Sequence, residues 1–265
     1  VIFADDLGYA DNSLYEGGRF STPNIERLAK SGVRFTAGYA SAPVCAPSRA
    51  GLMTGRYQER FGYEYNNGPA KRDAEQGLGM ATGERTIADY LKSAGYHTGM
   101  IGKGHLGSQE RYYPMNRGFD EFFGFLAGAH PYNVNANAPN NPVYRGSEPI
   151  EEKEYLTDAF GREAVSYIDR NKEKPFFLYL AYNAPHGPIQ PPADWLKRIR
   201  ERSPELPERR AKFVALTEHL DAGIGRVLVT LKELGIEENT VVIFTSDNGG
   251  DVPSGASAGP FRSHK

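Results

Sequence analysis

The chain has 265 residues and a mass of 29.2 kDa, enough for one large hydrophobic core and close to the size at which single cores stop growing. Apolar residues make up 39% of the sequence and charged residues 24%, and no apolar run could cross a bilayer, so we expect a globular protein that needs no membrane. The net charge of −2, without a Lys/Arg-rich arm, argues against a nucleic-acid partner, so any anionic substrate must be held by local charge.

Short apolar runs alternate with helical patterns along the chain. In chain order we expect a strand over 1–4, helices over 23–30 and 86–93, strands over 96–101 and 176–182, a long helix with an apolar stripe over 213–231, and a strand over 240–245. This alternation predicts an α/β fold with a mostly parallel central sheet flanked by helices on both faces. No internal repeat and no domain boundary is visible in the sequence.

Each of the four predicted strands ends abruptly in polar residues that can do chemistry. These residues are Asp5, Asp6, Lys103, His105, His186, Asp247 and Asn248. Because ligands of parallel sheets bind at the carboxyl ends of the strands, the pattern predicts one composite site. Taken singly, the Asp-Asp and Asp-Asn-Gly-Gly segments are typical of turns, and each histidine is more often structural. Together, their hard oxygen atoms suit Ca²⁺ or Mg²⁺ better than Zn²⁺.

Cys45 is the only cysteine of the chain and lies in the segment Cys45-Ala46-Pro47-Ser48-Arg49, ahead of Thr54-Gly55-Arg56. It has no intrachain disulfide partner, and a lone cysteine is most often a buried structural residue. Pro47 can open a helix, so position 45 is predicted to lie at a helix start, where backbone N–H groups favour an anion. The motif around the cysteine favours a chemical role.

The chain resembles the formylglycine-dependent (type I) sulfatases of the alkaline phosphatase superfamily over nearly its whole length. The segments that carry the resemblance occur in the family's order: 5–9 (DDLGY), 22–24 (TPN), 32–35 (GVRF), 45–57 (CAPSRAGLMTGRY), 102–107 (GKGHLG), 117–120 (RGFD), 185–186 (PH) and 246–249 (SDNG). The resemblance implies an alkaline-phosphatase-like sulfatase catalytic domain over 1–265. The family continues through further strands and a smaller subdomain, so we expect this domain to be truncated.

By this resemblance, a formylglycine-generating maturation enzyme oxidises Cys45 to an aldehyde. The implied metal is Ca²⁺, with Mg²⁺ as the other candidate, and its ligands are Asp5, Asp6, Cys45, Asp247 and Asn248. The implied sulfate pocket consists of Arg49, Lys103, His105, His186 and Lys265. One hydroxyl of the hydrated aldehyde would attack sulfur, His186 would protonate the departing alcohol, and His105 would take the proton of the second hydroxyl. Gly104 departs from the family, which usually has Trp there.

The family resemblance implies a sulfated small molecule or saccharide as substrate and a periplasmic or secreted location. Residues 58–83 and 128–154 are rich in Asn, Gly, Pro and Tyr and too long for ordinary connections, so we expect substrate-facing loops there, which favour a sugar. Related enzymes use the same aldehyde on phosphorus, so a phosphonate or phosphate ester hydrolase is one alternative. A non-catalytic carbohydrate-binding protein, in which Cys45 stays a thiol, is the other.

Two further segments match sequence motifs of other enzyme classes but lack the flanking elements that those motifs require. Residues 102–107 fit G-x-G-x-x-G, but a polar and aromatic stretch follows where a dinucleotide site needs a helix. Residues 255–259 fit G-x-S-x-G, but no strand precedes them and no helix follows, as a nucleophile elbow requires. We expect neither a dinucleotide site nor a serine nucleophile.

Overall fold

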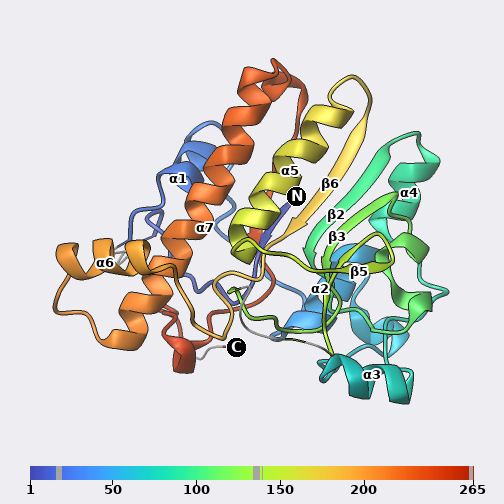
Figure 1. The fold of residues 1–265 in the computed structure, drawn as a ribbon, viewed down its shortest axis with the longest axis horizontal. Coiled ribbons are helices and arrows are strands. Elements are labelled where there is room, and N and C mark those ends of the chain that lie inside the picture. Colours follow the sequence, from blue (N-terminus) through green and yellow to red (C-terminus); the bar gives the residue numbers. More distant parts are fainter. Residues whose placement is uncertain (16–19, 134–137, 139, 263–264) are drawn as a thin grey trace.

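The structure is a computed structural model, and it describes residues 1–15, 20–133, 138, 140–262 and 265. At its centre lies a seven-stranded sheet in the order β5-β4-β3-β2-β6-β1-β7 (Figure 1). The strands are β1 (Ile2–Ala4), β2 (His97–Lys103), β3 (Glu121–Phe125), β4 (Val143–Arg145), β5 (Glu148–Ile150), β6 (Phe176–Ala181) and β7 (Phe244–Ser246). Along this order, the neighbours from β3 to β7 pair in parallel. Strand β4 pairs antiparallel with both β3 and β5. The sheet is therefore mostly parallel, as predicted.

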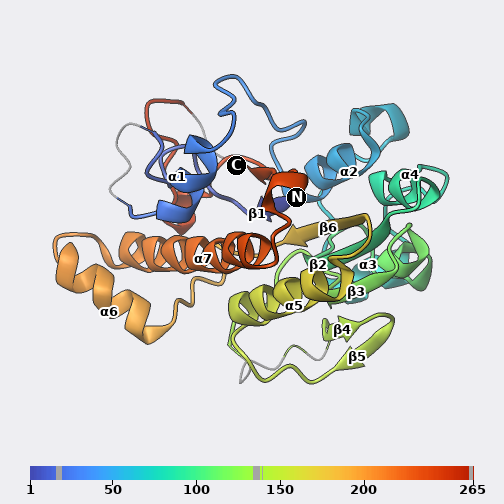
Figure 2. The same cartoon turned by 90° about the horizontal axis from the view of Figure 1, so that it is seen from above.

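Helices cover both faces of the sheet (Figure 2). They are α1 (Pro23–Lys30), α2 (Cys45–Thr54), α3 (Ala70–Gln76), α4 (Ile87–Ser93), α5 (Leu156–Asn171), α6 (Ala193–Arg202) and α7 (Glu208–Glu233). Successive side chains of a strand point to opposite faces. In β6, Leu178 and Leu180 pack in the core with α5 and α7, whereas Phe177, Tyr179 and Ala181 pack in the core that includes α2 and α4. The apolar run of β6 is thus buried on both sides.

Several predicted elements agree with the structure. Helix α1 has the predicted bounds, and α7 carries the whole predicted apolar stripe. Helix α4 begins just after Thr86, whose hydroxyl accepts from the Asp89 N–H while the Asp89 carboxylate accepts from the Thr86 N–H. Gly95, directly after this helix, has a φ of +87°, a conformation that favours glycine. The predicted helix end at Ser93 with Gly95 beyond it is confirmed, whereas Thr86, which the prediction placed inside the helix, is its N-cap.

Other elements differ from the predicted ones. The strand predicted over 240–245 is shorter and shifted: among the described residues β7 pairs only with β1, and Val241 before it is 85% exposed. Residues 58–83 contain helix α3, and the described part of 128–154 contains the β4–β5 hairpin; residues 134–137 and 139 lie outside the described residues. Strand β3 and helices α5 and α6 had no sequence prediction.

The two segments that match G-x-G-x-x-G and G-x-S-x-G lack the secondary structure that those motifs require. After residues 102–107 the chain forms a short 3-10 turn at Glu110–Tyr112, and residues 255–259 follow another such turn at Val252–Ser254. Further single 3-10 turns occur at Gln58–Phe61, Pro114–Asn116 and Glu237–Asn239. Within the described ranges, no helix is both long and apolar enough to cross a membrane.

The stripe of α7 gives a stability prediction. Leu220 is fully buried between α7 and the sheet, so Leu220→Ala should leave a cavity and lower the free energy of unfolding by about 2–5 kcal/mol. Val229 lies on the same helix with 42% of its surface exposed, and Val229→Ala should change stability far less. Urea unfolding of both variants measures the difference, and equal losses would contradict this packing.

Candidate active site

The predicted site residues meet at one edge of the sheet. The parallel strands β2, β6, β1 and β7 are neighbours in that order, so their carboxyl ends lie side by side. Asp5 follows β1, Lys103 ends β2, His186 follows β6 and Asp247 follows β7. Helix α2 begins at Cys45, beside the Asp5 and Asp6 side chains. Residues up to 259 positions apart in the sequence are thereby brought into contact.

The predicted metal ligands lie together, with Asp5 and Asp6 next to the Cys45 thiol. The Cys45 Sγ lies 3.5 Å from Asp5 Oδ1 and 3.9 Å from Asp6 Oδ1. Asp6 in turn contacts the loop after β7: its N–H donates to Asp247 Oδ1 at 3.1 Å, and its Oδ1 accepts from Asn248 Nδ2 at 2.7 Å. All five residues are buried, and Asp6 has a φ of +65°, which is uncommon for a residue other than glycine. The five form one compact group.

Three cationic side chains balance the carboxylates of this group. The closest N···O distances are 2.6 Å for Lys103 to Asp5, 2.9 Å for Arg49 to Asp247 and 2.8 Å for Lys265 to Asp6. Arg49 and Lys103 are fully buried, whereas Lys265 is partly exposed. Arg49 stands four residues after Cys45 in α2, so both side chains leave the same face of the helix. An anion at position 45 would therefore meet positive charge.

Burial governs how these groups ionise. Burial, reinforced by the nearby carboxylates, raises the pKa of the Cys45 thiol to about 12. Burial alone would also raise the pKa of Asp5, but the Lys103 ammonium and the neighbouring cations lower it to about 2. At neutral pH the site thus holds an ionised Asp5 and a protonated thiol. A thiol in this state is a poor nucleophile.

The two predicted histidines occupy different surroundings. His105 is buried, and burial, followed by the charges of Lys103 and Arg49, lowers its pKa well below the ordinary value, so its ring is neutral at pH 7. The His186 side chain is 20% exposed, and its Nε2 lies 3.5 Å from Asp6 Oδ2. His186 is therefore the histidine with access to solvent.

Backbone hydrogen bonds hold His105 in place, although Gly104 stands where the family usually has Trp. The Gly104 N–H donates to the Phe125 carbonyl at 2.8 Å, and the His105 N–H donates to the Leu126 carbonyl at 3.0 Å. These bonds continue the pairing of β2 with β3 past the ends of both strands. A Cβ at Gly104 would lie 3.3 Å from the Phe125 oxygen, so the backbones approach closely here. Backbone pairing, and not a packed side chain at 104, holds the position of His105.

The structure adds residues that the sequence reasoning missed. Asn66 Oδ1 accepts from the Ala46 N–H at 2.9 Å, directly after Cys45, and the Asn67 carbonyl lies 3.4 Å from His105 Nε2. Their segment was noted only for its Tyr- and Asn-rich composition. No spacing connects it to position 45 or to His105, so only the fold could make these contacts visible.

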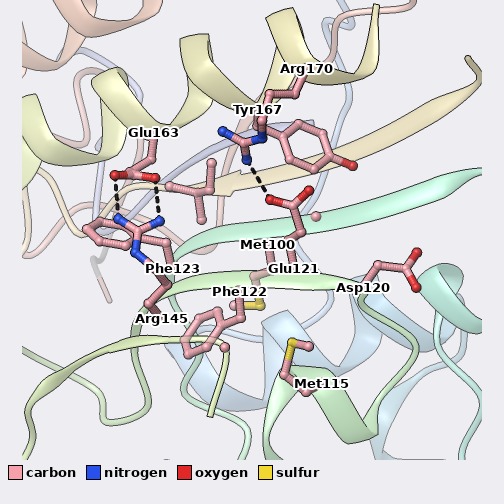
Figure 3. A pocket seen from close by; sticks show the side chains of 13 residues that line it. Met100, Met115, Asp120, Glu121, Phe122, Phe123, Arg145, Glu163, Tyr167 and Arg170 are labelled. Atoms are coloured by element: carbon pink, nitrogen blue, oxygen red, sulfur yellow. Dashed lines mark hydrogen bonds and ion pairs between the residues drawn. The ribbon is translucent and has the colours of Figure 1, made fainter. Parts of the chain in front are cut away.

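A separate cavity of about 270 Å³ lies near the other end of β2 and β3 (Figure 3). None of the predicted site residues lines it. Its charged groups have partners: Arg145 pairs with Glu163 at 2.7 Å and Arg170 with Glu121 at 2.6 Å. Asp120 pairs with Lys92, outside the cavity lining, at 2.6 Å. Paired charges offer little to an ionic substrate, so the candidate site remains the edge that carries Cys45.

Comparisons with known proteins agree with this geometry. A family model described as "Sulfatase" matches residues 1–265. N-acetylgalactosamine-6-sulfatase of Canis lupus familiaris is 35% identical, over 98% of this chain and 52% of its own length. Arylsulfatase of Klebsiella aerogenes is 31% identical, over 96% of this chain and 66% of its own length.

A crystal structure of another protein has a similar fold. Ps i-CgsB in complex with k-i-k-neocarrahexaose superposes with a TM-score of 0.91 at 36% identity, over 98% of this chain and 60% of that one. The chain spans about half the length of the first curated relatives that it matches. The match of the family model over all 265 residues and the shared fold lead to one conclusion: the chain belongs to the sulfatase family.

Proposed function

We propose that the protein hydrolyses sulfate esters, with a formylglycine formed from Cys45 as nucleophile and one bound Ca²⁺. The observation that carries the proposal is the buried Cys45, enclosed by carboxylates and followed in the same helix by Arg49. In this proposal residues 1–265 form a single catalytic domain, supported by cores on both faces of one sheet.

The donor atoms fit a hard divalent cation. One ligand atom each of Asp5, Asp6, Cys45 and His186 lies within 4.8 Å of the others. Asn248 Oδ1 is buried and has no hydrogen-bond partner among the described residues, which suits an oxygen ligand for a cation. Asp5, Asp6, Asp247 and Asn248 would hold Ca²⁺ together with the modified position 45. The cation would neutralise negative charge on the sulfate oxygens.

Position 45 fits a precursor better than a thiolate nucleophile. Burial and the neighbouring carboxylates keep the Cys45 thiol protonated, so the unmodified residue has little nucleophilic character at neutral pH. A hydrated aldehyde would instead supply a hydroxyl nucleophile at this place. The proposal therefore includes a maturation enzyme as a partner of the chain.

The other site side chains differ in charge and in solvent exposure, and we assign their roles from these two properties. The buried cations Arg49 and Lys103 would bind the sulfate oxygens. The partly exposed His186 would donate a proton to the leaving alcohol, and its Nδ1, 2.7 Å from the Gly187 carbonyl, leaves Nε2 for that task. The neutral His105 would accept a proton within the site, and Lys265 would add a positive charge beside Asp6.

For the substrate we propose a sulfated sugar or polysaccharide. The support comes from relatives: one is named for N-acetylgalactosamine 6-sulfate hydrolysis, and another was crystallised with k-i-k-neocarrahexaose. Assays with a panel of sulfate, phosphate and phosphonate esters on one alcohol would test the reaction class. Preference for phosphorus esters would favour the alternative hydrolase, and no turnover of any ester would favour a carbohydrate-binding protein. A periplasmic or secreted location completes the proposal and rests on the family resemblance alone.

The cation gives the first test of function. Ca²⁺ should raise the Tm of the full-length protein, because a ligand that binds only the folded state stabilises it, by about 2.7 kcal/mol at 100 times Kd. Asp6→Asn should abolish this rise, since Asn tolerates the positive φ of position 6 but lacks the charge. Asp194→Asn, on the exposed face of α6, is the matched control and should respond like the wild type. An undiminished Ca²⁺ response in Asp6→Asn would contradict the ligand set.

The chemistry of position 45 gives the second test. If Cys45 is converted, activity should depend on co-expression of the maturation enzyme, resist thiol alkylation and fall with aldehyde-reactive hydrazines. An ordinary thiolate would behave in the opposite way. The intact mass of the peptide that carries position 45 provides an independent readout.

The variant Cys45→Ser offers only one hydroxyl, so we expect a single turnover. Steady turnover without conversion of the serine would contradict the mechanism.

The leaving group gives the third test. His186→Ala should reduce hydrolysis of aliphatic sugar sulfates by roughly 10²–10⁴-fold, the usual contribution of a general acid. Aryl sulfates should suffer far less, because a phenolate departs without a proton. The comparison of kcat/KM on both substrate types measures the effect, and equal losses would exclude His186 as the acid.

A further inference from the structure

Backbone carbonyls hold the two site histidines by opposite ring nitrogens. His105 Nε2 lies 3.4 Å from the Asn67 carbonyl, and His186 Nδ1 lies 2.7 Å from the Gly187 carbonyl. A carbonyl oxygen only accepts hydrogen bonds, so each of these nitrogens must carry the hydrogen. In a neutral imidazole the other nitrogen then carries the lone pair. For His105 that atom is Nδ1, which is buried and has no partner within the described part of the chain.

The backbone at Gly128 packs against the His105 ring and restricts its orientation. A Cβ added to Gly128 would lie 2.6 Å from both Cε1 and Nε2, so the backbone at 128 lies against the Nε2 edge of the ring. The opposite tautomer would turn the Nε2 lone pair towards the Asn67 oxygen. It would also leave an Nδ1–H without an acceptor among the described residues. Both changes are unfavourable for a buried ring.

The side chain of the same Asn67 is held by a buried tyrosine. The Tyr63 hydroxyl donates to Asn67 Oδ1 at 2.8 Å, and both residues are buried. Tyr63 packs in one cluster with Ala46 and Ala50 of α2, the helix that begins at Cys45. The segment 63–67 therefore joins the helix of position 45 to the ring of His105.

We propose that Tyr63 and Asn67 are positioning residues that hold His105 as the Nε2–H tautomer, which makes Nδ1 its proton-accepting atom. Tyr63 orients the Asn67 side chain, and the Asn67 carbonyl then fixes the ring. The predicted effect on turnover rests on the proposed sulfatase function. The predicted tautomer does not, because it follows from the hydrogen bonds alone.

The direct test is ¹⁵N NMR of the histidine rings in the full-length, converted and Ca²⁺-loaded protein. Long-range ¹⁵N–¹H correlation distinguishes a protonated ring nitrogen from one with a lone pair, and the signals of His105 are those lost in His105→Ala. We expect a protonated Nε2 and an unprotonated Nδ1. A neutral His105 protonated on Nδ1 would overturn the proposal.

The variants test the positioning role. Tyr63→Phe removes the hydroxyl that holds Asn67, so His105 should populate both tautomers, and kcat should fall by roughly ten- to hundredfold with KM little changed. Asn67→Ala removes the same bond from its other side and serves if Tyr63→Phe does not fold. The double variant should lose no more than either single variant, because both break one interaction.

Tyr167→Phe is the matched control. It also removes a buried tyrosine hydroxyl, which donates to the His97 carbonyl at 2.9 Å at the far end of β2, so the His105 signals and kcat should not change. A wild-type spectrum and kcat in both Tyr63→Phe and Asn67→Ala would overturn the positioning role. The Nε2–H tautomer in a protein that hydrolyses no sulfate ester would contradict only the proposed function. Sulfate hydrolysis with His105 protonated on Nδ1 would contradict only this inference.

Discussion

The mutual neutralisation of buried charges at the carboxyl ends of β1, β2 and β7 is the constraint on which the rest depends. Asp5, Arg49, Lys103 and Asp247 are all fully buried, and a buried charge without a partner is strongly destabilising. Their contacts require the two aspartate loops to approach closely. A Cβ at Gly8 would lie 2.3 Å from the Ser257 oxygen, so only glycine fits there. The sheet register, the start of α2 and the absence of a side chain at Gly8 all contribute to this arrangement of charges.

The sequence predicted best where a local pattern carries the information. Strands that end in polar residues identified the edge of the sheet at which the candidate site lies, because parallel neighbours align their carboxyl ends. The end of α4 followed from Gly95, the glycine expected beyond it. The bounds of β7 were wrong, because the exposed apolar residues Val241 and Ile243 ahead of it resemble part of a buried strand. The sequence reasoning also missed Asn67, whose contact with His105 exists only after tertiary folding.

Two segments that carried the family resemblance have structural explanations. At residues 22–24, the Asp221 carboxylate of α7 accepts from the backbone N–H groups of Asn24 and Ile25 at 3.1 and 2.8 Å, which satisfies the first turn of α1. At residues 117–120, the buried Arg117 guanidinium donates to the carbonyls of residues 80, 81 and 84. The segments that carry the family resemblance therefore include residues that fasten one loop to another.

The hydrogen bond from the Asp6 N–H to Asp247 joins positions 241 apart, which has a consequence for synthesis on the ribosome. The chain grows from its N-terminus, so Asp5, Asp6 and Cys45 emerge long before the strand that completes their surroundings. Contacts of such long sequence separation form late and slowly. Cys45 is only 1% exposed in the folded chain, so its thiol is more accessible before folding is complete. The proposed maturation enzyme would therefore act on the nascent chain, before the contacts with the loop after β7 form.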